Sequence, residues 1–161
     1  MRLVTIGVYG WTEARFFAAL AAARVTTFVD IRRRRGLRGP LYAFANSRHL
    51  QRRLAELGIR YVHALELAPT EQMLGAQHAV DRKGAGVRKR TELSAEYLRE
   101  FGTRVLARFD PKAFLARFDE PRATVCLFCV EDDPAVCHRS LVAAKIEAAG
   151  AVAVTHLRPA P

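Results

Sequence analysis

The sequence predicts a single α/β domain in which a mostly parallel sheet of about five strands lies between two layers of helices. Short runs of β-branched and other apolar residues alternate with longer segments whose apolar residues recur at helical spacing. The 161 residues suit one domain, and no linker, repeat or low-complexity segment divides them. We therefore expect residues 1–161 to form one three-layer unit.

Strands are expected where an apolar run is too short and too β-branched to favour a helix. These runs cover residues 3–10, 26–32, 59–65, 124–130 and 151–157. The helical segments between them make parallel, right-handed connections the favoured topology.

Helices are expected to begin where a capping residue precedes an apolar stripe. The expected N-caps are Thr12, Asn46 or Ser47, Thr70, Ser94, Asp110 and Asp133. Two basic segments that contain glycine, residues 32–40 and 81–90, are expected to be loops, the second of them mobile.

The formal net charge of +10, from 26 Lys and Arg against 16 Asp and Glu, is the strongest compositional signal. Such a field attracts polyanions and favours nucleic acid or a phosphate-bearing small molecule as a partner. A solvated surface that uses Arg explains the same charge, and both interpretations stay open. No apolar run is long enough to cross a bilayer, so we expect no membrane partner and a cytoplasmic protein, with the oligomeric state unknown.

Reactive side chains follow the apolar strands at the points where the strands end. They are Tyr9, Asp30 and Arg32, His63 and Glu66, and Cys129 and Glu131. Ligands of parallel α/β sheets bind outside the carboxyl ends of the strands. If the strands are parallel, the sequence predicts one cavity at this edge.

All three cysteines lie in one short stretch, and their odd number does not describe a disulfide framework. Cys129 and Glu131 are two residues apart on an extended chain and share a face. Cys126 points to the opposite face, where we expect a small buried apolar residue.

Cys137, His138 and Arg139 follow the expected helix start at Asp133-Pro134. Free backbone N–H groups and the helix dipole lower a nearby thiol pKa and favour bound anions. Cys137 could equally be a core residue, and Arg139 could pair with Asp30 or Glu131 to close the end of the sheet.

The candidate residues of an enzyme acting on a phosphate-bearing or nucleic-acid substrate fall into two groups. The expected catalytic residues are Cys129, Glu131 and Cys137, with either thiol as nucleophile and Glu131 as general acid or base. The expected substrate- or anion-binding residues are Asp30, Arg32, His63, Glu66, His138, Arg139 and Ser140.

Three alternatives stay open beside the enzyme. A nucleic-acid-binding domain would use Tyr42 and Phe44 together with Arg33, Arg34, Arg35, Arg38, Arg82, Lys83, Arg88, Lys89 and Arg90. A structural zinc domain would use the three cysteines and His138, but Cys126 lies on the wrong face, so we expect neither a metal nor another cofactor. A redox pair would join Cys129 and Cys137 in a transient disulfide, if their separation allows it.

The ordered set of motifs resembles the domain-of-unknown-function 488 family of small bacterial and archaeal α/β proteins. The motifs are Thr5-Ile6-Gly7, Val29-Asp30-Ile31-Arg32, Tyr61-Val62-His63, Glu66-Leu67, Cys129-x-Glu131 and Cys137-His138-Arg139-Ser140-Leu141. The resemblance implies an α/β fold and a candidate site at the Cys-x-Glu and Cys-His-Arg motifs, without a defined reaction. Many relatives have His-Ser after Thr-Ile-Gly, where this chain has Val8-Tyr9.

Overall fold

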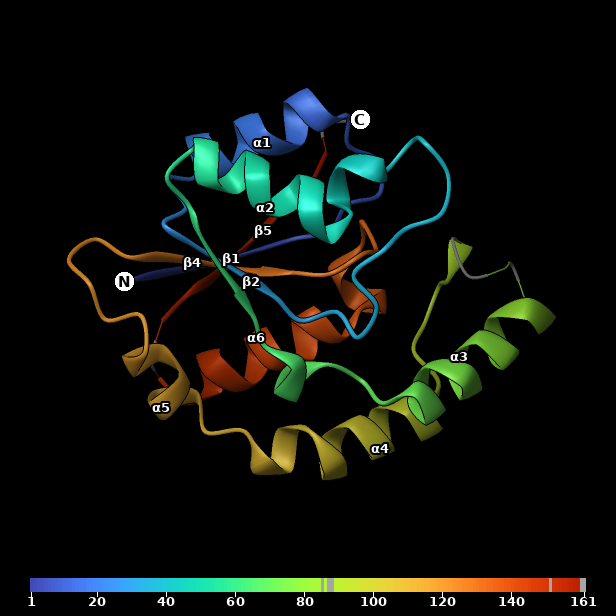
Figure 1. Cartoon of the computed structure of the whole chain (residues 1–161). Coiled ribbons are helices and arrows are strands. Elements are labelled where there is room, and N and C mark those ends of the chain that lie inside the picture. The colour runs from blue at the N-terminus through green and yellow to red at the C-terminus, as the bar shows by residue number, and fades with distance from the viewer. Residues whose placement is uncertain (85, 87–88, 151, 160–161) are drawn as a thin grey trace.

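The protein is a five-stranded, fully parallel sheet with helices on both faces, in a computed structural model that describes residues 1–84, 86, 89–150 and 152–159 (Figure 1). The strands are β1 (Arg2–Ile6), β2 (Thr27–Asp30), β3 (Arg60–His63), β4 (Thr124–Phe128) and β5 (Val154–Leu157). The α/β fold class is therefore confirmed. Ala151, the first residue of the last predicted strand, lies outside the described residues.

Six α-helices connect the strands in the described part of the chain. They are α1 (Glu13–Ala22), α2 (Ser47–Glu56), α3 (Glu71–Lys83), α4 (Ala95–Arg104), α5 (Pro111–Ala116) and α6 (His138–Ala148). None of these helices is long and apolar enough to span a membrane.

The strand order β3-β2-β4-β1-β5 places β4 between β1 and β2. From β2 the chain continues to β3, at one edge of the sheet. From β4 it passes β1 and continues to β5, at the other edge. Right-handed crossovers in opposite directions put their helices on opposite faces, so α1 and α2 cover one face and α6 covers the other (Figure 1). This reversal is a topological switch point, where parallel sheets bind ligands.

Each face of the sheet packs its own hydrophobic core, and β4 contributes to both. Val125, Leu127 and Cys129 pack with α4, α5 and α6, whereas Cys126 and Phe128 pack with α1 and α2. The alternation along β4 thus confirms that Cys126 lies on the face opposite Cys129.

The observed helix N-termini can be compared with the N-caps predicted from the sequence. The side chains of Thr12, Thr70 and Ser94 accept hydrogen bonds from the first turns of α1, α3 and α4, as predicted. Asp133 caps a short 3-10 turn, Pro134–Val136, and α6 begins only after Cys137, its N-cap. The prediction that α6 starts at Asp133 was therefore wrong by one turn.

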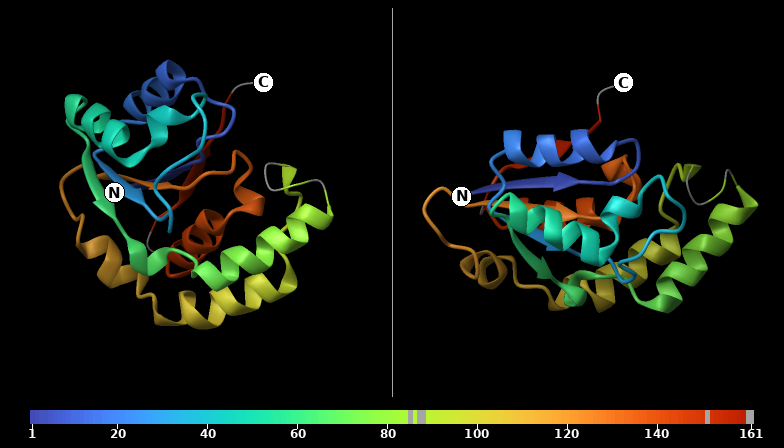
Figure 2. Two further views of the ribbon diagram at one scale, coloured as in Figure 1. Left: turned by 45° about the vertical axis from the view of Figure 1, so that its right-hand side comes forward. Right: turned by 45° about the horizontal axis from the view of Figure 1, so that its top comes forward.

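The segment predicted as a mobile loop from residue 81 is helical through Lys83. Asp81 is buried and bonded to Gln77 and Arg90, so α3 continues past the predicted end. α3 and α4 lie side by side and extend beyond the carboxyl edge of the sheet (Figure 2). We call this pair the helical arm.

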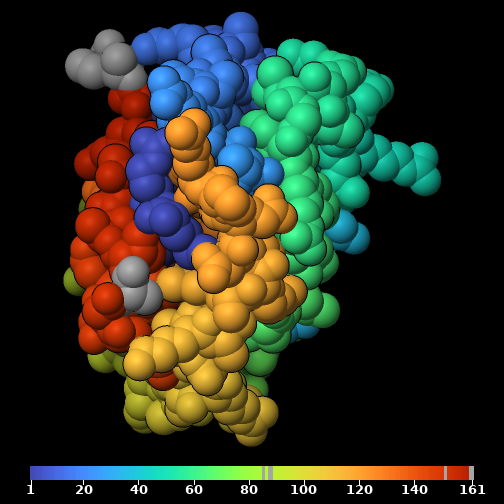
Figure 3. All heavy atoms as spheres, turned by 90° about the vertical axis from the view of Figure 1, so that its left-hand side faces the viewer, coloured from blue at the N-terminus to red at the C-terminus, as the bar shows by residue number. Residues whose placement is uncertain are grey.

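The opposite, amino-terminal edge of the sheet has a shallow hollow that contains none of the predicted site residues. It is lined by Met1, Arg2, Arg24, Thr26, Arg122 and Ala123. In a view from this side, the N-terminus lies between the C-terminal segments and the loop before β4 (Figure 3).

Gly7 allows the chain after β1 to lie against the chain after β4. The N–H of Val8 donates to the carbonyl of Val130 at 2.9 Å, which extends the β1–β4 pairing. A Cβ at Gly7 would overlap the carbonyl oxygen of Glu131 and lie 3.0 Å from Nη1 of Arg139. The small residue of the Thr-Ile-Gly motif is required by this close backbone approach.

We predict that Gly7→Ala lowers the free energy of unfolding by about 2 kcal/mol or more, because backbone atoms must move to admit a methyl group. Urea denaturation measures the change. Gly75→Ala in α3 is the matched control, since no heavy atom lies near its added Cβ and Ala favours the helix. Equal effects of the two substitutions would contradict the prediction.

Candidate functional site

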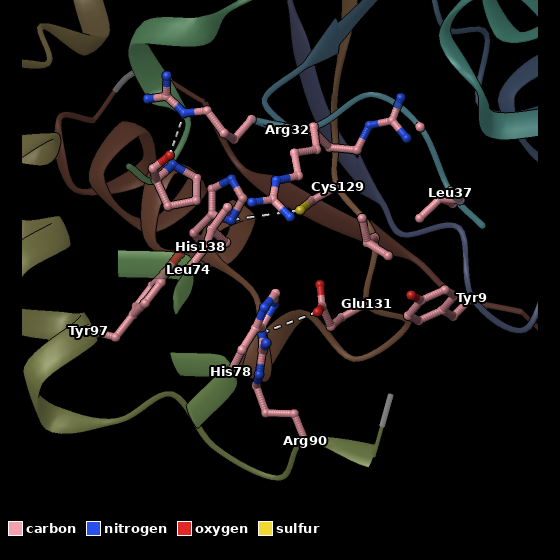
Figure 4. A pocket seen from close by; sticks show the side chains of 15 residues that line it. Tyr9, Arg32, Leu37, Leu74, His78, Arg90, Tyr97, Cys129, Glu131 and His138 are labelled. Carbon is pink, nitrogen blue, oxygen red and sulfur yellow. Dashed lines mark hydrogen bonds and ion pairs between the residues drawn. The ribbon is translucent and has the colours of Figure 1, made fainter. Parts of the chain in front are cut away.

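A cavity of about 210 Å³ opens at the carboxyl edge of the sheet, at the switch point (Figure 4). Its walls come from the ends of β1, β2 and β4, from the helical arm and from α6. The lining residues are Tyr9, Arg32, Arg33, Arg34, Gly36, Leu37, Pro69, Leu74, His78, Arg90, Tyr97, Cys129, Val130, Glu131 and His138.

Two thiols meet beside this cavity. Cys129 follows β4 and Cys137 caps α6, and their sulfurs and a ring nitrogen of His138 all lie within 4.8 Å of one another. Cys129 is 4% exposed and lines the cavity, whereas Cys137 is 1% exposed and does not line it. A ligand in the cavity therefore meets Cys129 first.

The ring of His138 is oriented by a backbone carbonyl. Its Nε2 lies 2.9 Å from the carbonyl oxygen of Ile31, which only accepts, so Nε2 carries a proton. Its Nδ1 then faces the thiols, 3.7 Å from Sγ of Cys129 (Figure 4). Nδ1 can exchange a proton with either sulfur.

The two thiols are electrostatically different. Burial raises the pKa of Cys137, but hydrogen bonds from Cys129 and His138 and the charge of Arg139 outweigh it and hold the pKa well below its usual value. The hydrogen bond to Cys137, with burial, raises the pKa of Cys129. Burial lowers the pKa of His138, but the hydrogen bond to Cys137 outweighs burial and raises this pKa above its usual value. The pKa of Cys137 is thus shifted below the usual thiol value and that of Cys129 above it.

Arg139 is fully buried in the first turn of α6. It donates hydrogen bonds to Oγ1 of Thr5 at 3.3 Å, to the carbonyl of Asp132 at 2.8 Å and to the carbonyl of Glu131. None of these acceptors is charged. The predicted pairing of Arg139 with Asp30 or the Glu131 carboxylate does not occur, and the guanidinium has no carboxylate partner within the described chain.

Asp30 pairs with Arg32 instead. Both are buried, and Asp30 accepts from Nε of Arg32 at 2.9 Å, from Nη2 at 2.8 Å and from the hydroxyl of Tyr61 at 2.9 Å. The guanidinium of Arg32 also lies 4.5 Å from the ring centroid of Phe128 and lines the cavity. Its Nη1 has no hydrogen-bond partner within the described chain. One donor of this cation is thus unused, and the donor atom itself is buried.

Glu131 lies on the cavity wall, where Arg90 reaches it from the segment before α4. Nη1 of Arg90 is 3.2 Å from the Glu131 carboxylate, while Nη2 is 2.7 Å from Asp81. Burial and the charge of Cys137 raise the pKa of Glu131 to about 7, although Arg90 opposes the shift. Glu131 can therefore give or take a proton near neutral pH.

Four other predicted site residues lie away from the cavity. His63 contacts the carbonyl of Arg32 at 3.0 Å, exposed Glu66 pairs with Arg117 at 3.0 Å, and Ser140 donates to the carbonyl of Cys137 at 2.9 Å. Asp30 acts through Arg32. The structure brings none of these four side chains to the cavity wall.

Some of the predicted nucleic-acid-binding residues are exposed, and others are bonded to groups within the protein. Arg38, Arg82, Lys83 and Lys89 are exposed, and Arg88 lies outside the described residues. Arg33 donates to the carbonyl of Pro69 at 2.8 Å, Arg34 pairs with Glu71, and the neighbouring Tyr61 raises the pKa of Arg35. Arg90 is buried in its two ion pairs. Phe44 is 5% exposed in the core, so its predicted contact with bases was wrong.

Two titratable residues of the cavity, Tyr97 and His78, were not predicted from the sequence. Tyr97 belongs to the apolar stripe of α4, and burial raises its pKa, so its hydroxyl stays protonated. His78 lies on α3, where burial and the charge of Arg90 lower its pKa. Neither position has a local signal, because each becomes part of the site only when the helical arm packs against the strand ends.

The same cluster could hold a metal ion. The sulfurs of Cys129 and Cys137 and Nδ1 of His138 are soft donors, and the bond from Nε2 of His138 to a carbonyl is the usual outer partner of a metal-bound imidazole. Three donors with a cavity beside them fit a thiophilic cation such as Zn²⁺.

The fold and the site together define a single α/β domain with a buried thiol, imidazole and guanidinium cluster at the switch point of a parallel sheet. The family model described as "Domain of unknown function DUF488" matches residues 12–146. The chain therefore belongs to the DUF488 family. No curated protein and no solved structure matches it.

The Asp81–Arg90 ion pair predicts acid sensitivity. Burial raises the pKa of Asp81, but hydrogen bonds from Arg90 and Gln77 outweigh it and lower the pKa below its usual value. A carboxylate with a lowered pKa stabilises the fold above its unfolded-state pKa of about 4, and this contribution is lost as the pH falls through the folded value.

We expect Asp81→Asn to lower the free energy of unfolding at neutral pH by about 3 kcal/mol, since it leaves the buried Arg90 half-paired. It should also reduce the loss of stability between about pH 5 and pH 3. Urea denaturation at several pH values measures both effects. Glu71→Gln, at an exposed ion pair, is the control. If Asp81→Asn and the wild type lose stability equally on acidification, the pair has no such linkage.

Proposed function

We propose that the protein is a thiol-dependent enzyme that acts on a small substrate with an anionic group such as phosphate. The observation that carries the proposal is the position of Cys129, the one thiol on the cavity wall, within reach of His138 and Cys137. Nucleophile and proton acceptor are already adjacent, as a thiol nucleophile requires.

The cavity walls support an anionic substrate. Four arginines line them: Arg32, Arg34 and Arg90 pair with carboxylates, whereas Arg33 donates to the neutral carbonyl of Pro69. Arg33 and Arg34 keep donors beyond their bonds to Pro69 and Glu71, and Nη1 of Arg32 makes no bond in the described chain. An anionic group entering here gains charge-assisted hydrogen bonds.

The residues then take distinct roles. Cys129 passes its proton toward Cys137 or Nδ1 of His138 and attacks the substrate, while Glu131 protonates the leaving group from the cavity wall. Arg139 keeps negative charge on the thiol pair favourable and holds the backbone of Glu131 in place. Arg139 is in this scheme a positioning residue rather than an anion clamp.

We predict that Cys129→Ser lowers turnover by roughly a thousandfold or more, because a serine hydroxyl is a poor substitute for an activated thiol. Glu131→Gln should lower it by about a hundredfold or more. The measurement is a turnover screen with mononucleotides, sugar phosphates and phosphopeptides. Cys126→Ala, on the opposite face of β4, is the matched control and should keep full activity. Turnover that survives both Cys129→Ser and Glu131→Gln would refute the roles assigned here.

A zinc-binding function is the second candidate, favoured by the three converging donor atoms. Elemental analysis of purified protein tests it. If the candidate is right, zinc is present at one ion per chain, and both Cys137→Ser and His138→Ala lose it while Cys126→Ala retains it. Zinc-free protein that gains no zinc on incubation would exclude this function.

A further inference from the structure

We propose that Cys129 and Cys137 form a redox-active pair that a hydroperoxide oxidises to an intramolecular disulfide. The oxidation would switch off the thiol-dependent enzyme proposed above, because it consumes the thiol on the cavity wall. The proposal rests on that function for its regulatory meaning alone, since the disulfide itself forms without any substrate.

The two sulfurs are close neighbours in the reduced protein. The two sulfurs lie within 4.8 Å of each other, and a disulfide needs about 2.05 Å. Cys137 is the N-cap of α6 but makes no side-chain capping bond. Its side chain can therefore rotate toward Cys129 without breaking a helix-stabilising hydrogen bond.

The two cysteines differ in access. Cys129 lines the cavity, so a peroxide entering from solvent reaches its sulfur, while Cys137 lies behind it. Cys129 is therefore the residue that attacks the peroxide, and Cys137 is the residue that attacks the resulting sulfenic acid. Cys126 is fully buried on the other face of the sheet and takes no part.

The cluster contains the groups that each step needs. Nδ1 of His138 faces the thiols and can take the proton of Cys129. The guanidinium of Arg139, bonded only to neutral oxygens, favours negative charge on the sulfurs until the disulfide forms.

The reaction balances in two steps. The thiolate of Cys129 attacks one peroxide oxygen, an S–O bond forms, the O–O bond breaks, and the departing alkoxide leaves as an alcohol with one proton. The thiolate of Cys137 then attacks the sulfenic sulfur, an S–S bond forms, and hydroxide leaves as water with the second proton. Two thiols lose two electrons and two protons, and the hydroperoxide gains them.

Mass spectrometry after treatment with tert-butyl hydroperoxide tests the proposal. Trypsin leaves all three cysteines in one peptide, because no Lys or Arg separates Ala123 from Arg139. Cleavage before Asp132 or Asp133 separates Cys129 from Cys137, so a disulfide holds the two fragments together. We expect the intact chain to lose about 2 Da and the linked fragments to part on reduction.

Variants assign the order of the two steps. Cys126→Ala should form the same linked fragments, which excludes Cys126 as a partner. Cys137→Ser should stop at a sulfenic acid on Cys129 that dimedone traps, and Cys129→Ser should give no adduct on Cys137. These readouts use chemical labels, so they need no enzyme activity.

The proposal is overturned if native wild-type protein keeps both thiols in hydroperoxide while urea-unfolded protein loses them. It is also overturned if the disulfide includes Cys126, or if dimedone labels Cys137 in Cys129→Ser. A disulfide without turnover on any substrate would refute the enzyme and leave the redox pair. If Cys129→Ser loses turnover but the wild type forms no disulfide, the redox pair is refuted and the enzyme stands.

Discussion

The buried guanidinium of Arg139 is the interaction on which the carboxyl edge of the sheet depends. It joins three motifs that are far apart in the sequence: Thr5 on β1, the backbone of Glu131 and Asp132 after β4, and the start of α6. Each bond from a charged donor contributes about 1.5–3 kcal/mol. Three of them offset a desolvation cost of several kcal/mol for the buried cation. The requirement for glycine at position 7 follows, since any side chain there would meet both Glu131 and Arg139.

The two buried arginines solve the same electrostatic problem differently. Arg32 is neutralised by a bidentate partner, Asp30, so the pair contributes little net field to the site. Arg139 has only neutral acceptors among the described residues, and its charge favours the thiolate forms of Cys129 and Cys137. The arginine of the Cys-His-Arg motif therefore acts electrostatically on the cysteines of the site.

The sequence predicted the elements well where local chemistry decides them. Parallel strands, the helix caps at Thr12, Thr70 and Ser94, and the opposite orientation of Cys126 all follow from period, capping and strand alternation. The convergence of Cys129 and Glu131 at one cavity followed from the rule for parallel sheets.

Apart from the start of α6, the failures involve long-range pairing. Asp81 and Arg90 belong to a stretch with the composition of a solvated loop, and their burial depends on Glu131, which lies some forty residues further along. His63 and Glu66 stand at a strand end, as the rule requires, but β3 is the edge strand and its end lies away from the cavity. Strand order decides that placement, and no local pattern contains it.

The ion pairs of Arg90 also make the cavity conditional on the helical arm. Asp81, Arg90 and Glu131 come from α3, from the segment before α4 and from the loop after β4. One wall of the cavity is therefore held by buried ion pairs and by α4, whose Tyr97 and Phe101 belong to the hydrophobic core on that face of the sheet. Opening this wall would expose part of that core to water, so the shape of the cavity and the stability of the core are linked.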